Sequence, residues 1–367
     1  MKIGIMHNLY GQYSHGGAET VAEKMINNLR ATGEEVFLIT TKPPKAAIPA
    51  AGDTPKDLKI YYLNSVFYNL DKIPIAGRLF WHVNNVFSFK KSRKIKKILT
   101  EEKPDLVITH NLMGLGFLTP LAIKKLKIKH YHFLHDIQLI HPSGLMIYGQ
   151  ENKINGSGAQ AYQALTRALF ASPAKIISPS RWLLNMHIER GFFKDSEIEI
   201  KPLDLKFTPA AATNNEKTAA SEQANGLIRF LFLGQIEKQK GIFLLVEAFK
   251  KISDAKARLT IIFRNTAGQS AALKKIIGDD KRIEVLGPLA FLEANKIMAA
   301  CDCLIVPSLC YENSPSVIYG AHANGLKIIA SDIGGIPEIM APGDVLFRPG
   351  DEEDLKRKIN EFIKTAR

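Results

Sequence analysis

The chain has 367 residues, of which 46% are hydrophobic and 23% are charged. This composition excludes an intrinsically disordered protein, and the length exceeds what one hydrophobic core usually serves, so we expect two domains. The formal net charge is +13, and residues 1–206 hold most of it, with 28 Lys and Arg against 17 Asp and Glu. A basic first half favours an anionic partner such as a membrane surface, a nucleic acid or a phosphorylated substrate.

The chain contains no run of about 18 uncharged apolar residues, so we expect no membrane-spanning helix. The N-terminal stretch KIGIM is too short for the apolar core of a signal peptide and is typical of a first strand. Three cysteines lie in apolar surroundings, at Cys301, Cys303 and Cys310. They have too few neighbouring ligands for a metal site, which favours buried thiols in a reducing cytosol.

Alternating strand and helix patterns start at the N-terminus. An apolar strand at 2–6 is followed by a polar loop, a helical pattern at 18–32 and a second strand at 35–41. One face of the helical pattern is apolar, with Val21, Met25, Ile26 and Leu29. The order strand, loop, helix and strand predicts a βαβ unit with parallel strands.

Short apolar runs that end in polar residues continue through the first half, at 104–110, 129–135 and 174–180. Ligands of open parallel sheets bind at the carboxyl ends of the strands, so these polar ends are candidate site positions. A stretch of small, polar, aperiodic residues follows at 208–226 and predicts a linker.

A second alternating series follows this linker. Its strand patterns are LIRFLFLG, ARLTIIFRN, RIEVLG, CDCLIVPS and KIIAS, and its helical patterns are GIFLLVEAFKKIS and the residues near 315–324. We therefore predict an α/β protein with two Rossmann-like, doubly wound domains. The predicted boundaries are 1–206 for the first domain, 207–226 for the linker, 227–350 for the second domain and 351–367 for a C-terminal helix.

Two loops have features of phosphate sites. In SHGGAE, Gly16 and Gly17 precede a helix and would let a ligand approach backbone N–H groups that attract anions, although such a pair is also common in ordinary turns. In GQIEKQKG, Lys240 stands at a helix start, where the ammonium group and the helix dipole both suit a diphosphate. The alternative is that Lys238 and Lys240 are solvated loop lysines.

Two titratable side chains stand at other predicted strand ends. His135 could hydrogen-bond a hydroxyl group of a ligand or assist proton movement, or it could be a structural histidine. Glu312 precedes a Ser-Pro-Ser turn in which Ser314 and Ser316 are candidate helix N-caps. Glu312 either satisfies N–H groups at that helix start or accepts hydrogen bonds from ligand hydroxyls.

Residues 77–99 combine aromatic and basic side chains: Phe80, Trp81, Phe87 and Phe89, followed by a dense run from Lys90 to Lys97. Aromatic side chains beside a polybasic cluster are typical of a segment that lies on anionic lipid. The alternative is an amphipathic helix that packs its aromatic side chains inward and exposes a solvated lysine face. Nucleic-acid binding is not favoured, because no recognition motif accompanies the lysines.

The order of these motifs along two α/β domains resembles the retaining glycosyltransferases of GT-B fold, of the family-4 type, which transfer sugars from nucleotide-sugar donors. The resemblance covers nearly the whole chain. It is most specific at residues 305–338, where IVPS, ENSPSVIYGAHANG and KIIASDIGGIPE follow the donor-site pattern of the family. It implies a GT-B fold, in which the two Rossmann-like domains face each other across a cleft.

The resemblance also implies roles for the site residues. Lys240 and Gln235 would lie at the diphosphate of the donor, with Gly16 and Gly17 from the first domain. His135 would contact the transferred sugar. Glu312 would match the first carboxylate of the paired-glutamate motif, which contacts the same sugar. The following helix start would bind the donor through Asn313, Ser314, Pro315, Ser316 and Val317. No metal and no other cofactor would be needed, because Lys and helix dipoles stabilise the leaving nucleoside diphosphate.

Three features depart from the family pattern. Gln235 stands where an arginine commonly accompanies the lysine, and the C-terminal helix after Asp354 looks abbreviated. Gly320 replaces the second glutamate, which usually holds the ribose hydroxyls. Loss of that charged hydrogen bond would weaken donor binding by roughly 1.5–3 kcal/mol if nothing replaces it.

The expected function is transfer of a sugar from a UDP- or GDP-linked donor to a cell-surface glycan, such as lipopolysaccharide, or to a lipid-linked acceptor. The expected location is cytoplasmic, with peripheral binding of the inner face of the plasma membrane through the Lys90–Lys97 region. The alternative is a catalytically weak or silent GT-B subunit that acts as a scaffold for another glycosyltransferase. Gln235 and Gly320 favour this alternative, whereas His135, Lys240 and Glu312 oppose it.

Overall fold

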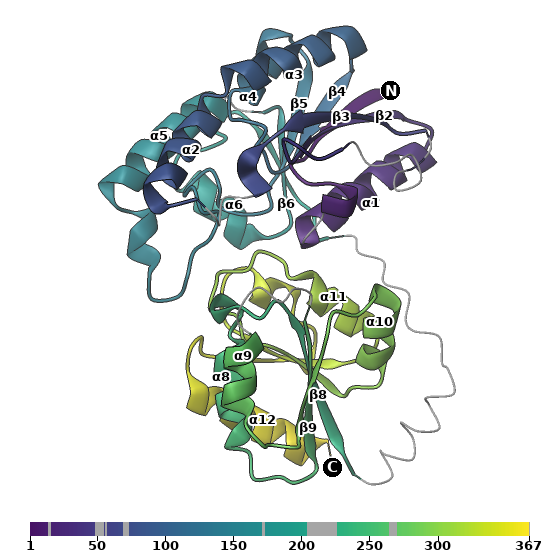
Figure 1. Ribbon diagram of the computed structural model, residues 1–367, viewed down its shortest axis with the longest axis vertical. Helices are drawn as coiled ribbons and strands as arrows, with labels where there is room; N and C mark the ends of the chain where they lie inside the picture. The colour runs from purple at the N-terminus through teal and green to yellow at the C-terminus, as the bar shows by residue number, and fades with distance from the viewer. Residues whose placement is uncertain are drawn as a thin grey trace. The chain divides into compact units, whose positions relative to one another are not determined.

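The computed structural model describes residues 1–13, 16–47, 55, 57–68, 73–170, 173–203, 226–263 and 270–366. The chain divides into two compact units, Met1–Leu145 with Asn152–Leu203 and Met146–Glu151 with Asp204–Arg367. Each unit is built on a parallel sheet with helices on both faces (Figure 1). The predicted linker at 207–226 lies, except for Gly226, outside the described residues.

The first unit contains a seven-stranded sheet in the order β3-β2-β1-β4-β5-β6-β7, and its strand pairs are parallel. The strand order reverses between β1 and β4, so the carboxyl ends of these strands form the switch point where ligands of such sheets bind. The strands are β1 (Lys2–Met6), β2 (Glu35–Lys42), β3 (Lys59–Asn64), β4 (Leu106–Thr109), β5 (Lys129–Phe133), β6 (Lys175–Ser178) and β7 (Glu197–Ile200).

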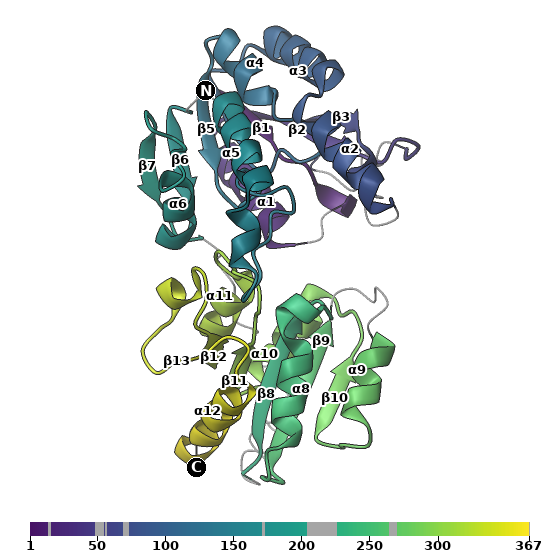
Figure 2. The same ribbon diagram turned by 90° about the vertical axis from the view of Figure 1, so that its left-hand side faces the viewer.

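Helices cover both faces of this sheet. The helix α1 (Gly17–Ala31) lies on one face, and α3 (Phe89–Glu102), α4 (Thr119–Lys125) and α5 (Ser157–Phe170) lie on the other (Figure 2). The predicted apolar face of α1 is confirmed, because Val21 and Ile26 are buried and Met25 and Leu29 pack against the same core. The unit contains two further helices, α2 (Ile75–Val86) and α6 (Arg181–Ile188).

A single buried carboxylate ties the amino ends of β1 and β3 to the end of α3. Glu102 accepts a hydrogen bond from Lys2 Nζ at 2.8 Å and further ones from Lys59 and Tyr61. Burial by itself raises the pKa of Glu102, but the hydrogen bonds from these three groups lower it to about 2. Ligands of such sheets bind at the carboxyl ends of the strands, whereas this network lies at the amino ends. We therefore assign it a role in the stability of the fold and not in ligand binding.

The second unit contains a six-stranded sheet in the order β10-β9-β8-β11-β12-β13, again with parallel pairs. Its switch point lies between β8 and β11. The strands are β8 (Ile228–Gly234), β9 (Ala257–Phe263), β10 (Ile283–Leu286), β11 (Cys303–Val306), β12 (Lys327–Ser331) and β13 (Val345–Phe347). The predicted α/β class with two doubly wound sheets is thus confirmed.

Two layers of helices bury the faces of the second sheet. The helices α8 (Ile242–Lys250), α9 (Ser270–Ile277) and α12 (Glu352–Thr365) cover one face, and α10 (Phe291–Ala299) and α11 (Ser316–Ala323) cover the other (Figure 1). The C-terminal helix α12 packs against α8 of its own unit, and the ring of Phe362 lies 5.6 Å from that of Phe230.

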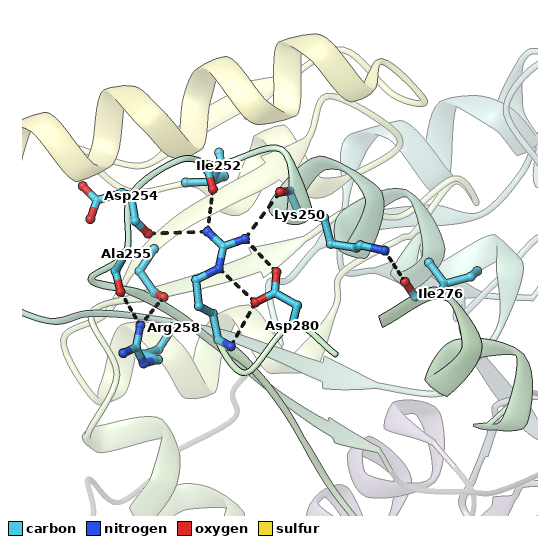
Figure 3. A network of polar contacts seen from close by, with 9 residues as sticks. Lys250, Ile252, Asp254, Ala255, Arg258, Ile276 and Asp280 are labelled. Carbon is cyan, nitrogen blue, oxygen red and sulfur yellow. Dashed lines mark hydrogen bonds and ion pairs between the residues drawn. The ribbon is translucent and has the colours of Figure 1, made fainter. Parts of the chain in front are cut away.

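A network of polar contacts lies at the amino end of β10 (Figure 3). The guanidinium group of Arg282 binds Asp280 at 2.6 Å and donates to the carbonyl oxygen of Ile252 at 2.5 Å. It also lies over the ring of Phe249. These contacts fasten the end of α8 to the turn before β10, at the end of the sheet opposite to the ligand edge, so we assign the network a structural role.

Candidate active site

Two charged side chains meet beside the switch point of the second sheet. Lys240 Nζ lies 2.6 Å from Oε1 of Glu312, and the side chains are only 27% and 19% exposed. Burial by itself lowers the pKa of Lys240, but the carboxylate of Glu312 more than compensates and raises it. The ammonium group is therefore charged throughout the physiological pH range.

A close backbone contact fixes the position of Lys240. The next residue, Gly241, has φ of +72°, and a Cβ there would lie 1.7 Å from the carbonyl oxygen of Pro307, so only glycine fits. On the other side of Lys240, the carbonyl oxygen of Gln239 accepts hydrogen bonds from the backbone N–H groups of Leu309 and Cys310 at 2.8 and 3.1 Å. The loop after β8 and the loop after β11 are thereby held together.

The carboxylate of Glu312 has two further partners. Ser308 Oγ donates to its Oε1 at 3.1 Å, and Cys310 Sγ donates to the same atom at 3.4 Å. Burial raises the pKa of the Cys310 thiol to about 12, so this group remains a hydrogen-bond donor at neutral pH. The Oε1 atom of Glu312 is thus engaged by Lys240, Ser308 and Cys310, and these contacts orient the carboxylate.

The two glycines of the DIGG sequence hold the backbone of Glu312. Gly335 N–H donates to the carbonyl oxygen of Glu312 at 2.8 Å. Gly334 has φ of +63°, and a Cβ there would lie 2.3 Å from that oxygen. Both glycines belong to the motif that carries the family resemblance, which implied no role for them. In the structure their contacts fix the backbone position of Glu312.

Helix α11 begins four residues after Glu312, and its N-cap is Pro315. The prediction that Ser314 and Ser316 cap the helix is wrong. Ser316 is the first helical residue, and the hydroxyl of Ser314 lies 2.9 Å from that of Tyr319 instead. The N–H groups of Ser316 and Val317 have no partner within the helix, which gives this end a positive potential next to Glu312.

The remaining candidates of this unit lie along the same edge. Gln235 directly follows β8, and its carbonyl oxygen accepts from the N–H of Glu237 at 2.9 Å. Asn313 lies between Glu312 and the turn before α11. Gly320 is buried within α11, and its carbonyl oxygen accepts from the side chain of Asn324 at 2.8 Å. The structure therefore gathers the predicted donor-site residues of the second half at one edge of one sheet.

A short segment from the first half of the chain belongs to this edge as well. Met146–Glu151 is part of the second unit, where Ile147 forms an antiparallel bridge with Cys310. Tyr311 contributes two hydrogen bonds to the same segment, from its N–H to Met146 O at 2.9 Å and from its hydroxyl to Glu151 at 2.8 Å. No local pattern predicts this contact, since Tyr311 and Glu151 are 160 positions apart in the chain.

In the first unit, histidines occupy the ends of three neighbouring strands. His7 follows β1, His110 follows β4 and His135 lies two residues after the end of β5. His135 Nε2 lies 2.8 Å from His110 Nδ1, and Phe133 stacks on the rings of both. Burial and the neighbouring histidines hold the pKa of His135 well below its usual range. His135 is therefore neutral at physiological pH.

The carboxyl group next to His135 organises its loop. Asp136 accepts hydrogen bonds from the N–H of Gln138 at 2.8 Å and from the side chain of Asn111 at 3.2 Å. Burial raises the pKa of Asp136 to about 6, although both hydrogen bonds act in the opposite direction. These contacts connect the loops after β4 and β5 and hold His135 in place.

The glycine loop precedes α1, for which Gly16 is the N-cap and Gly17 the first residue. Glu19 is buried in the first turn of this helix, and a Cβ at Gly16 would lie 3.2 Å from its carboxylate. Ser14 and His15 of the predicted loop lie outside the described residues.

The aromatic and basic segment forms two helices, α2 and α3. Phe80 and Phe89 are 71% and 62% exposed, and Phe87 is also exposed, whereas Trp81 is half-buried with its ring 6.0 Å from that of Phe67. The alternative in which the aromatic side chains pack inward is therefore wrong for the three phenylalanines and correct for Trp81. Lys90, Arg93, Lys94, Lys96 and Lys97 are exposed nearby. Lys91 differs, because its ammonium group donates to the carbonyl oxygen of Gly114 and burial lowers its pKa to about 8.

Within the described ranges, no group of three or more His, Cys, Asp or Glu side chains is arranged to hold a metal ion. Over the same residues, none of the helices has the length and apolarity needed to cross a membrane.

Two parallel, doubly wound sheets, with candidate residues at the carboxyl edge of each, are the architecture of the GT-B fold. Comparison with protein families agrees. The model described as "Glycosyltransferase Family 4" matches residues 15–202, just over half of the chain, and the model "Glycosyl transferases group 1" matches residues 228–365. The chain belongs to this glycosyltransferase family, and it is an enzyme of that class.

Individual relatives are distant. The chain is 24% identical over 345 residues to an uncharacterized 42.6 kDa protein in the cps region of Klebsiella pneumoniae, covering 92% of this chain and 87% of that protein. It is 27% identical over 206 residues to the lipopolysaccharide 1,2-N-acetylglucosaminetransferase of Salmonella typhimurium, covering 52% and 53%. Anabaena Alr3699/HepE, solved with UDP and glucose, superposes with a TM-score of 0.71 at 17% identity over 100% of this chain and 92% of that one, which establishes the shared fold.

Proposed function

We propose that the chain is a retaining glycosyltransferase that uses a UDP- or GDP-linked sugar as its donor. The observation that carries this proposal is the Lys240–Glu312 pair next to the start of α11. The ammonium of Lys240 and the N–H groups of Ser316 and Val317 suit a diphosphate, since both favour negative charge. The carboxylate of Glu312 suits the hydroxyls of the sugar, from which it can accept hydrogen bonds. A structurally similar protein whose structure holds UDP and glucose supports a uridine nucleotide.

The reaction we propose breaks the bond between the anomeric carbon and the diphosphate and forms a bond to the acceptor oxygen on the same face of the sugar. The acceptor proton passes to the departing phosphate oxygen. Lys240 and the N-terminus of α11 stabilise the charge that develops on this phosphate, so no metal ion is required. The backbone N–H groups at Gly16 and Gly17, at the start of α1, also suit a phosphate group.

For the acceptor we propose a cell-surface glycan or a lipid-linked precursor at the inner face of the plasma membrane. The names of two relatives, from a cps region and from lipopolysaccharide synthesis, support this class of product. The exposed phenylalanines and lysines of α2 and α3 support binding to an anionic lipid surface. The alternative of a silent scaffold is not favoured, because the chain belongs to an enzyme family and Lys240 and Glu312 are both present.

Thermal unfolding with UDP, GDP and their sugar conjugates tests the donor site. We expect at least one nucleotide to raise the melting temperature of the wild type, and Lys240→Ala and Glu312→Gln to reduce this shift. Lys238→Ala is the matched control, because Lys238 is exposed in the same loop and should leave the shift unchanged. If none of the nucleotides stabilises the wild type, the proposed function is wrong. NMR of the anomeric proton of the first product decides between retention and inversion.

A further inference from the structure

The three histidines at the carboxyl ends of β1, β4 and β5 are packed into one cluster. The ring centroid of His110 lies 5.1 Å from that of His135 and 5.6 Å from that of His7, and His7 lies 5.9 Å from His135. His7 and His110 are fully buried, whereas His135 is partly accessible. His135 is thus the member of the cluster that a ligand can reach.

Only one of the two buried histidines is hydrogen-bonded to His135. His110 Nδ1 and His135 Nε2 lie 2.8 Å apart. Neither ring nitrogen of His7 has a hydrogen-bond partner among the described residues, and the same holds for Nε2 of His110. His7 therefore contacts His135 through ring packing alone. His110 packs on His135 as well, and it also forms a hydrogen bond with Nε2 of the His135 ring.

Both members of the bonded pair are neutral, since burial lowers the pKa of His110 to about 3 and that of His135 well below its usual range. A neutral imidazole has one N–H and one acceptor nitrogen, so one ring donates and the other accepts. If His135 donated, the proton of His110 would be on Nε2 and would form a buried N–H without a partner. Buried N–H groups of this kind are rarer than buried acceptors without a partner. The arrangement in which His110 Nδ1–H donates is thus favoured.

We propose that His110 is a positioning residue that holds His135 in the tautomer with its proton on Nδ1. In this tautomer Nε2 of His135 accepts from His110, and Nδ1–H is the polar group with which His135 can donate to a hydroxyl of the transferred sugar. His135 then acts as a neutral hydrogen-bond donor and not as a base. This inference rests on the proposed function and on the role that the family resemblance implies for His135, which is contact with the transferred sugar.

His7 provides a matched control for the packing of the cluster. We compare His110→Phe with His7→Phe, which replace equally buried rings but remove the hydrogen bond to His135 in only one case. We expect His110→Phe to lower kcat/KM by about tenfold and His7→Phe to lower it by no more than about twofold. His110→Asn, whose amide can bond to His135 Nε2, should recover most of the loss. Equal losses in the two Phe variants would overturn the inference.

A double variant separates this inference from the proposed function. If His110 acts through His135, His110→Phe should cause no additional loss in a His135→Ala background. If His135→Ala lowers activity, and His110→Phe lowers it further in that background by the same factor as in the wild type, His110 is not the positioning residue. If His135→Ala leaves activity unchanged, His135 does not contact the sugar and the inference is overturned, whereas the proposed function, which rests on Lys240 and Glu312, is not affected.

Tautomers can also be observed directly in the wild type, so the test does not depend on whether the variants fold. Two-bond proton–nitrogen correlation spectra of protein with ¹⁵N-labelled histidine, assigned with His135→Gln, distinguish the two neutral forms. We expect the protonated nitrogen of His135 to be Nδ1 at neutral and mildly alkaline pH, because burial holds the pKa of the ring well below its usual range. A protonated Nε2 at neutral pH would refute the proposal.

Discussion

Lys240 and Glu312 are 72 positions apart in the chain, and their side chains meet with 2.6 Å between Nζ and Oε1. The pair joins the loops that follow β8 and β11, the two strands at the switch point of the second sheet. Its geometry depends on glycines that bring backbone segments into direct contact, at Gly241 and at Gly334. These glycines are therefore as much a part of the proposed donor site as the charged side chains.

Gly334→Ala should impair the donor site more than it impairs the fold. A methyl group at this position would collide with the carbonyl oxygen of Glu312, and the residue has positive φ. Gly325→Ala is the control, because its φ of +78° imposes a similar strain of about 1–2 kcal/mol without any atom within 4 Å of the new Cβ. Urea unfolding and nucleotide thermal shift should show a loss of nucleotide stabilisation in Gly334→Ala alone. Equal behaviour of the two variants would show that the contact with Glu312 is unimportant.

Glu102 should stabilise the first unit in a pH-dependent manner. Its pKa is lowered in the folded state to about 2, so its contribution is fully present above the unfolded value near 4.5 and is lost as the pH falls toward 2. We expect Glu102→Gln to cost on the order of 2 kcal/mol at pH 7, a value reduced by the exposure of Lys59. In urea unfolding at several pH values, the difference in the free energy of unfolding between the wild type and Glu102→Gln should become smaller below pH 4.5. Glu101→Gln is the control, since Glu101 is exposed and should change stability little at any pH.

Vesicle sedimentation tests the lipid surface proposed for α2 and α3. Replacing Lys90, Lys94 and Lys97 by Ser should reduce binding to vesicles with anionic lipid by at least about tenfold, since each lysine contributes about 1 kcal/mol. Lys91 must be kept, because its buried hydrogen bond to Gly114 supports the fold. The control removes three exposed lysines elsewhere in the same unit: Lys124, Lys125 and Lys153. Equal loss of binding in both variants would mean that net charge, and not this surface, attracts the lipid.

Gly320→Glu tests whether the donor site lacks a carboxylate. We expect tighter binding of the nucleotide, by up to about tenfold, if the new side chain reaches the ribose hydroxyls. Gly320→Gln is the matched control for size, and it should bind less tightly than the Glu variant because its hydrogen bonds lack charge. Isothermal titration with the nucleotide found by thermal shift gives both affinities. Loss of binding in the Glu variant would mean that the buried position of Gly320 is needed for the packing of α11.

The sequence predicted the central strands well and the edge strands poorly. Strands such as β1, β4 and β8 are nearly continuous apolar runs because helices cover both faces of the sheet. The edge strands β3, β7 and β13 are only partly buried, so their sequences lack this signal, and none of the three was predicted. The edge strand β10 of the second sheet was predicted, from the apolar residues of RIEVLG.

For the candidate site, the sequence indicated individual residues but not their contacts. Lys240 and Glu312 stand at strand ends that could be recognised, yet their pairing depends on approaches between distant backbone segments at Gly241 and Gly334. His110 also ends a predicted strand. It was not predicted as a site residue, because only its contact with a residue on the next strand, here His135, indicates a role for it. Tertiary contacts of this kind have no local pattern.

The membership of Met146–Glu151 in the second unit has a practical consequence for dissecting the enzyme. A fragment that begins at residue 204 would lack Ile147, which forms the antiparallel bridge with Cys310, and Glu151, which accepts the hydrogen bond from the hydroxyl of Tyr311. Chimeras that exchange whole halves between relatives at the linker would likewise pair one parent's Tyr311 with the other parent's residue 151. Recombination within this family should therefore succeed more often when the segment at 146–151 is taken from the same parent as the second half.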